Sequence, residues 1–180
     1  MDLKEPVAMT LLKPEPETML DDLYNGKILA YAGNISHVGT LKNSQASADA
    51  ISKLCGSRVS VDLVLSGQTV VEFAQRVKAC ALGQAAAGIV SENVIGATID
   101  ELQTAQKQLK GMLAGDGVTP DGRFENLKYL EPVKDHRSRH ASTLLVLDAL
   151  LDAANQIETG NGNIAAGAQS TETLNAPQAM

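Results

Sequence analysis

The chain has 180 residues with 15 Lys+Arg against 21 Asp+Glu, which gives a formal net charge of −6 at pH 7. This acidic balance argues against general nucleic-acid binding, which depends on a basic surface. No apolar run approaches the ~20 residues of a membrane-spanning helix, and the N-terminus lacks the basic and apolar regions of a signal peptide. We therefore expect a cytoplasmic protein whose thiols stay reduced.

The first part of the chain predicts little regular structure. Residues 1–16 contain three prolines and no sustained periodicity, so we expect a flexible arm. An imperfect apolar stripe predicts a helix over 17–32, ended by Gly33 and Asn34. The segment 35–45 is rich in Gly, Asn and Ser and predicts a loop.

Three strands are expected next, over 46–54, 58–65 and 69–78. The second has the clearest pattern, because Val59, Val61 and later apolar residues alternate with polar ones. The links between the strands are too short for parallel crossovers, so the strands form an antiparallel meander.

Helices are expected in the second half of the chain. Their ranges are 81–94, rich in small residues; 98–115, opened by a capping box; and 132–157, begun by Pro132. From residue 158 the composition is too polar to bury a core, which predicts a disordered tail over 158–180. The prediction is one domain over 17–157 with an α+β fold, a three-stranded antiparallel sheet with helices packed on one face.

Two cysteines stand out because each lies in a run of small residues at the end of a predicted strand. Cys55 is part of Cys-Gly-Ser before the second strand, and Cys80 lies where the third strand gives way to a helix. Thiols in such places can approach one another, and they suit soft metals or sulfur chemistry. The alternative is that both are small buried hydrophobic residues, as free cysteines most often are.

The last predicted helix carries two histidines four residues apart, His136 and His140, on one face. His140 also heads an apolar stripe, so it could simply be half-buried. With the two cysteines, two histidines would complete a tetrahedral zinc site or the ligand set of a two-iron cluster. The neighbouring Arg137 and Arg139 either form a solvated face or lower the pKa of a thiol.

Enzyme motifs are absent. The sequence has no Gly-rich phosphate loop followed by Lys, no Gly-x-Ser-x-Gly and no His-Glu-x-x-His. A Cys–His nucleophile pair would lack a third residue to orient it. A binding protein is therefore expected rather than an enzyme.

The order of these features resembles the IscU/NifU/SufU family of iron–sulfur cluster assembly scaffolds, over roughly residues 17–157. The most specific pieces are Cys55-Gly56-Ser57, Cys80 between strand and helix, and Leu130 to Lys134. The last segment is similar to the family's Leu-Pro-Pro-Val-Lys chaperone-recognition segment, with Glu131 replacing one proline. The resemblance implies a cysteine desulfurase and an Hsp70-type chaperone as partners.

The resemblance also implies a site built from three cysteines, an Asp two residues after the first, and often a His before the third. Cys55 and Cys80 match the first two cysteines, and Ser57 stands where the Asp is expected. A hydroxyl is a poorer metal ligand than a carboxylate, so Ser57→Asp should raise metal affinity. The third cysteine is missing.

Two ways of counting place the missing cysteine differently. Counting forward from Lys134 puts His136 at the family's histidine and Arg137 at the cysteine. Counting back from Asp148 lands near Ser142. His140 lies between the two, and we expect it to affect metal retention more than His136 does.

The leading prediction is a scaffold-like protein that holds an iron–sulfur cluster or a single metal ion, iron or possibly zinc. Its ligands would be Cys55, Cys80 and one or both of His136 and His140, with Ser57 beside them. One alternative is a sulfur acceptor that carries persulfide from a cysteine desulfurase. Another is a non-catalytic, zinc-binding relative that keeps the partner surface alone.

Overall fold

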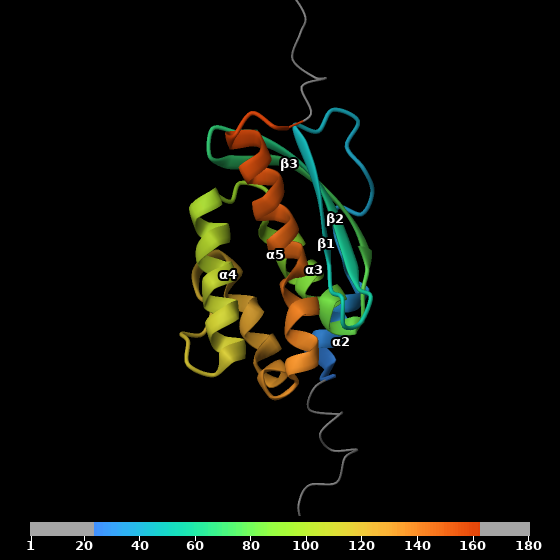
Figure 1. Ribbon diagram of the computed structural model, residues 1–180. Helices are drawn as coiled ribbons and strands as arrows, with labels where there is room; N and C mark the ends of the chain where they lie inside the picture. The colour runs from blue at the N-terminus through green and yellow to red at the C-terminus, as the bar shows by residue number, and fades with distance from the viewer. Residues whose placement is uncertain (1–23, 163–180) are drawn as a thin grey trace, which may run out of the picture.

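The computed structural model describes residues 24–162 and is shown in Figure 1. The predicted arm and most of the predicted tail lie outside these residues. The described elements are α2 (Gly26–Gly33), β1 (Ala46–Ile51), β2 (Arg58–Ser66), β3 (Thr69–Lys78), α3 (Ala81–Asn93), α4 (Ile99–Ala114), the 3-10 segment η1 (Gly122–Asp135) and α5 (Arg137–Glu158).

The three strands form one antiparallel sheet in the order β1-β2-β3. On β2 the alternating residues Val59, Val61 and Leu63 are buried, as the period of two requires for a strand with one face on the core. Val61 lies opposite Ala48 on β1 and Gln75 on β3. The predicted meander is confirmed.

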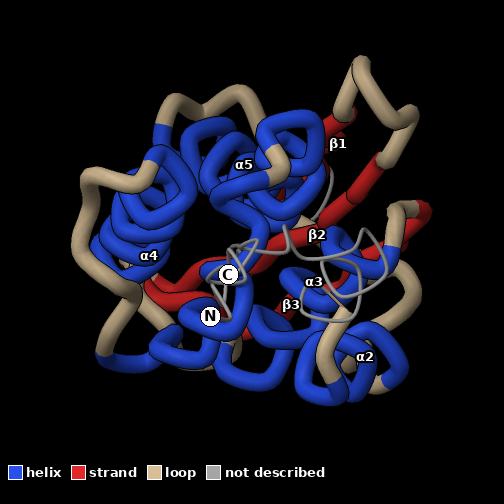
Figure 2. The backbone as a smooth tube through the Cα atoms, turned by 90° about the horizontal axis from the view of Figure 1, so that it is seen from below, coloured by secondary structure: helices blue, strands red, loops and turns tan. Residues whose placement is uncertain are grey.

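Helices cover the apolar face of this sheet. Helix α5 packs on β1 and β2, α3 packs on α5, and α4 and α2 flank them. Figure 2 views α4 and α5 nearly along their axes, side by side. The small residues of α3, Ala85 to Gly88, are fully buried and let neighbouring backbones approach closely. The predicted α+β class, with helices packed on one face, is confirmed.

The other face of the sheet carries an ion pair between buried Asp62 and partly exposed Arg76, which fastens the loop before β1. Arg76 Nη1 donates to Asp62 Oδ2 at 2.9 Å, and Ser47 Oγ and the amide of Leu41 also donate to this carboxylate. Burial alone would raise the pKa of Asp62, but the hydrogen bonds from Arg76, Ser47 and Leu41 outweigh it and hold the pKa below its usual value.

The prediction of a continuous helix over 17–32 is wrong. The described helix begins at Gly26, and Tyr24 and Asn25 lie outside it. Asn25 is its N-cap, because its Oδ1 accepts hydrogen bonds from the backbone amides two and three residues later, both at 3.1 Å. The part of the predicted helix before Tyr24 lies outside the described residues.

The last helix begins later than predicted. Pro132 lies inside η1, and α5 starts at Arg137, after His136 with φ −118° and ψ 69° interrupts the helical backbone. Leu130 and Val133 of η1 are fully buried. Tertiary packing of these two side chains therefore holds a 3-10 segment where the sequence predicted the first turn of a helix.

Candidate functional site

The turn between β1 and β2 is built to present Cys55. The amide of Ser52 donates to the carbonyl of Ser57 at 2.8 Å, and the amide of Gly56 donates to the carbonyl of Ser52 at 2.9 Å. Gly56 has φ +69°, a left-handed conformation that glycine adopts without strain. This turn ends the first strand at Ile51, three residues before the predicted end.

The thiol of Cys55 lies between two buried hydroxyls. Its Sγ is 3.3 Å from Ser52 Oγ and 3.1 Å from Ser57 Oγ. Hydrogen bonds from Ser52 and Ser57, aided by the positive charge of Arg139, lower the pKa of the Cys55 thiol to about 7, although burial opposes them. A large fraction of Cys55 is therefore thiolate near neutral pH, the form that binds metals and attacks sulfur.

The second thiol lies at the start of α3. Cys80 is the N-cap residue of this helix, and its amide donates to Ser57 Oγ at 3.3 Å. Its Sγ lies 3.4 Å from Oγ of Ser142 on α5, which is 1% exposed. A Cβ on Gly83 would lie 2.9 Å from the Ser142 carbonyl oxygen, so glycine here allows α3 and α5 to meet.

Ser57 joins the two halves of the site, because its hydroxyl contacts both the Cys55 thiol and the Cys80 amide. The β1–β2 turn and the first turns of α3 and α5 lie at the same end of the molecule, the lower end in Figure 1. The structure thus brings Cys55, Ser57 and Cys80 together and adds Ser52 and Ser142.

The two histidines have other contacts. His140 Nε2 lies 3.1 Å from the carbonyl oxygen of Val133 and 3.0 Å from that of Lys134. Since carbonyl oxygens only accept, Nε2 carries the proton and fastens the end of η1 to α5. The backbone amide of His136 donates to the Val133 carbonyl, and this residue precedes α5.

Within residues 24–162, no hydrogen bond joins either histidine to a thiol, and no group of three or more His, Cys, Asp or Glu side chains could hold a metal ion. The assignment of His136 and His140 as metal ligands therefore stays a prediction, as does that of Cys55, Cys80 and Ser57. The structure supports the thiols by proximity to one another and offers the histidines no such support.

A match to a known protein family covers both the sheet and the thiol-bearing turn of this chain. The model of the NifU-like N terminal domain family matches residues 23–146, more than half of the chain. This chain belongs to the NifU-like N-terminal domain family. The predicted resemblance to IscU, NifU and SufU is confirmed.

Individual relatives agree with this family. A nitrogen-fixing NifU-like protein (N-terminal) from Brucella abortus has a crystal structure with 50% sequence identity and a TM-score of 0.77, covering 78% of this chain and 98% of its own. The iron–sulfur cluster assembly scaffold protein IscU of Thermotoga maritima is 22% identical over 135 residues, which are 75% of this chain and 94% of that protein. FiSufU of Fervidobacterium islandicum AW-1, at 22% identity and a TM-score of 0.68, covers 74% of this chain and 97% of its own and shares the fold.

Ser142, like Ser52, is a site residue that sequence reasoning did not select for this NifU-like domain. The count back from Asp148 did reach it, but a serine gave no reason to prefer it over His136 or Arg137. Only the structure shows its contact with Cys80, because the two residues are 62 positions apart in sequence and meet through the packing of α3 on α5.

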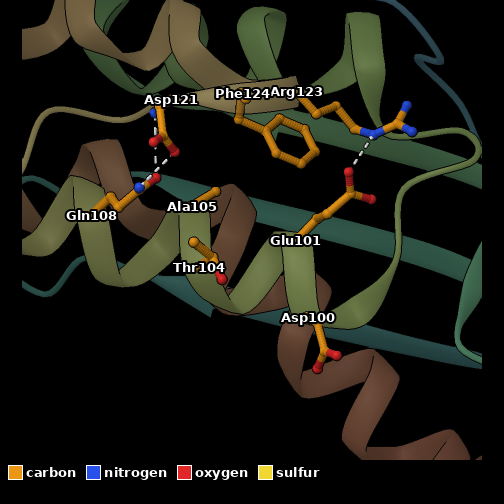
Figure 3. Close-up of a pocket in the computed structure, with 9 residues that line it drawn as sticks. Asp100, Glu101, Thr104, Ala105, Gln108, Asp121, Arg123 and Phe124 are labelled. Atoms are coloured by element: carbon orange, nitrogen blue, oxygen red, sulfur yellow. Dashed lines mark hydrogen bonds and ion pairs between the residues drawn. The ribbon is translucent and has the colours of Figure 1, made fainter.

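A separate pocket of about 230 Å³ lies between α4 and η1 and contains neither thiol. Figure 3 shows some of its polar side chains paired across the opening, while Asp100 and Thr104 have no partner among the residues drawn. Arg123 Nε donates to Glu101 Oε1 at 3.1 Å, and Gln108 Nε2 donates to Asp121 Oδ1 at 2.7 Å. These two pairs link α4 to the start of η1 across the pocket. Among the described helices, none combines the length and apolar character needed to cross a membrane.

Proposed function

We propose that this chain is an iron–sulfur cluster assembly scaffold that holds its cargo at Cys55 and Cys80. The observation that carries the proposal is the position of the two cysteines, one on each side of the Ser57 hydroxyl, at one end of a NifU-like domain. The Thermotoga maritima relative is named as an iron–sulfur cluster assembly scaffold protein, which supports the same function here.

The chemistry of the site suits temporary binding. Thiolates are soft ligands that bind iron well, and hydrogen bonds already stabilise the thiolate of Cys55. The positive charge of Arg139 favours a negatively charged cargo beside it. The surrounding hydroxyls are neutral and bind iron weakly, so the cargo is released more readily than from a complete set of strong ligands. Free thiols need a reducing compartment, and we propose the cytoplasm.

The test is anaerobic reconstitution of the full chain with ferrous iron and sulfide, followed by visible absorption and by iron and sulfide analysis. Cys55→Ser and Cys80→Ser should each bind about tenfold less iron or lower still, whereas Ser66→Ala, at the exposed end of β2, should bind as much as the unaltered chain. A colourless protein that instead binds one zinc ion would overturn the cluster function and favour the zinc-binding relative.

The ligand set we propose rests on the thiols, with Ser57 as the nearest hydroxyl. His140 could join it only by giving up its hydrogen bonds to the Val133 and Lys134 carbonyls. A carboxylate in place of the hydroxyl would add a stronger ligand between the thiols, so Ser57→Asp should raise affinity for iron. Equal affinity of the variant and the unaltered chain would show that this position does not face the cargo.

A second function is favoured by the lowered pKa of Cys55. As thiolate, Cys55 would attack the terminal sulfur of a persulfide on a cysteine desulfurase. The donor's S–S bond breaks, the donor cysteine leaves as thiolate, and Cys55 keeps the transferred sulfur as a persulfide with no net oxidation. Persulfide labelling after incubation with a desulfurase and free cysteine should mark Cys55 in the Cys80→Ser variant and leave Cys55→Ser unmarked.

Partner binding at 130–134 needs a local opening of the fold. Leu130 and Val133 are fully buried, while Glu131 and Lys134 are exposed and form an ion pair at 3.4 Å. An Hsp70-type chaperone that reads an extended apolar segment would reach these side chains only after η1 unfolds. We therefore expect a peptide of residues 128–136 to bind such a chaperone more tightly than the folded chain does.

A further inference from the structure

The thiol site lies in a positively charged part of an otherwise acidic chain. The three segments that build it, 52–58, 76–83 and 134–142, contain seven basic residues and one acidic residue, Asp135. Three of the seven form ion pairs, with Asp49, Asp62 and Glu131. The other four form no ion pair within residues 24–162: Lys53, Lys78, Arg137 and Arg139.

Three of these unpaired cations lie beside the thiols, and we call Lys53, Lys78 and Arg139 the basic rim. Lys53 and Cys55 share the turn between β1 and β2, at the lower end of the molecule in Figure 1, and Lys78 lies two residues before Cys80. Besides the hydrogen bonds from two serine hydroxyls, the positive charge of Arg139 lowers the pKa of the Cys55 thiol, so Arg139 lies near that sulfur. Lys53 and Lys78 are exposed, which leaves their ammonium groups open to a ligand in solution.

Iron held by the two thiols would have empty coordination positions. An iron ion takes about four to six ligands, whereas the full sequence holds two cysteines. The serine hydroxyls that contact the thiols are neutral and bind iron weakly. Among the described residues, no group of three or more His, Cys, Asp or Glu side chains could complete the shell. Another molecule therefore has to supply the remaining ligands.

Charge determines which kind of molecule fits. Two thiolates balance the two charges of ferrous iron, so the basic rim keeps its positive charges without a counter-charge once iron is bound. Cations are repelled from such a rim and small anions are attracted to it. A small polycarboxylate meets both needs, because some of its carboxylates bind the iron while another pairs with the lysine ammonium groups or the arginine guanidinium.

We propose that iron reaches this chain as a complex with a small polycarboxylate such as citrate, which stays on the iron and is held by Lys53, Lys78 and Arg139. This inference rests on the proposed function, since it takes iron as cargo. Ferrous iron keeps carboxylate oxygens, releases water and gains the sulfurs of Cys55 and Cys80. No electron moves, and each thiol that enters as S–H releases its proton to solvent.

The test is anaerobic gel filtration of the full chain, reduced with a phosphine, after mixing with ferrous iron and radiolabelled citrate. Iron and citrate are then measured in the protein fraction. The expected result is about one citrate for each iron, and Cys80→Ser should lose both together. Labelled acetate has a single carboxylate, which cannot bind the iron and the basic rim at once, so it should not be retained.

Paired charge variants test the basic rim without touching a thiol. Lys53→Glu combined with Lys78→Glu should lower the retained citrate about tenfold, because it reverses two of the three rim charges. Lys42→Glu combined with Lys107→Glu is the matched control. It changes the net charge equally at two exposed positions, in the loop before β1 and on α4, and should retain citrate as the unaltered chain does.

The possible failures are distinguishable from the same fractions. Iron bound without citrate in the unaltered chain would overturn the polycarboxylate proposal and leave the scaffold function intact. Equal citrate retention in the two double variants would overturn the assigned rim in the same way. A chain that binds no iron, whether citrate is present or left out, would overturn the scaffold function and this inference with it.

Discussion

Two regions of this molecule carry side chains that can bind metals, and they use them differently. At the β1–β2 turn, the Cys55 thiol lies among hydroxyls that stabilise its charged form and leave the sulfur accessible. At the start of α5, the His140 ring nitrogen is bonded to two backbone carbonyls and joins η1 to the helix. The Cys55 thiol therefore remains available for binding, whereas the His140 ring is engaged in holding the backbone of η1 against α5.

The difference shows that residue type does not determine availability for binding. A side chain whose polar atom is already hydrogen-bonded to the backbone must give up those bonds in order to bind a metal, which costs about 1 kcal/mol for each bond. A thiol that lies beside hydroxyls loses much less, because the hydroxyls can turn to the bound species. Four variants break or sharpen this comparison, and we give them from the largest expected effect to the smallest.

The largest effect is expected from Gly83→Val, which separates α3 from α5 at the thiol site. A Cβ there would lie 2.9 Å from the Ser142 carbonyl oxygen and 2.8 Å from the Ala79 Cβ, so the helices must move. We expect a loss of roughly 3 kcal/mol in unfolding free energy and weaker iron binding. Gly26→Val, where nothing lies within 4 Å, is the control for denaturant unfolding, and equal losses would contradict the close-packing argument.

The next effect is a gain, from Ser142→Cys. The Ser142 hydroxyl lies 3.4 Å from Cys80 Sγ, so a cysteine there places a third thiol beside the second. We expect iron retention against a chelator to rise about tenfold, because a thiolate replaces a weak ligand. Ser91→Cys, which changes another buried serine, on α3, is the control. If both variants retain iron as the unaltered chain does, Ser142 does not face the cargo.

His140→Ala should separate stability from binding. The Lys134 carbonyl loses its ring donor, while the Val133 carbonyl keeps the amide of His136, so we expect the unfolding free energy to fall by about 1 kcal/mol. Iron retention should stay unchanged, and His37→Ala, on the exposed loop before β1, is the control for both measurements. A large loss of iron retention at unchanged stability would restore His140 to the ligand set.

The smallest effect concerns proton binding at Cys55. Because the Ser52 and Ser57 hydroxyls stabilise the thiolate, the rate of alkylation of Cys55 should rise with pH around a midpoint of about 7. Removing one hydroxyl in Ser57→Ala raises the thiol pKa and moves that midpoint to higher pH. Measurements in a Cys80→Ala background isolate Cys55, with Ser66→Ala as control, and an unmoved midpoint would show that Ser57 does not stabilise the thiolate.

Local sequence patterns were sufficient for most of the fold. The alternation in β2, the turn residues between β2 and β3 and the capping box of α4 all act within a few residues, and the elements appear where they were predicted. Predictions failed where a local signal competed with packing. Pro132 indicated a helix start, but the burial of Leu130 and Val133 holds that segment as 3-10 structure.

The sequence by itself was enough to single out the two cysteines, to place them at strand ends and to indicate the family. All three depend on residue type and spacing along the chain. Only the tertiary structure decided which other side chains meet them. Ser142 reaches Cys80 from 62 residues away, and His140 turns instead to backbone carbonyls. Neither outcome is visible in spacing, because side-chain neighbours across elements are set by how closely helices pack, here at Gly83, and by which backbone carbonyls a side-chain donor can reach.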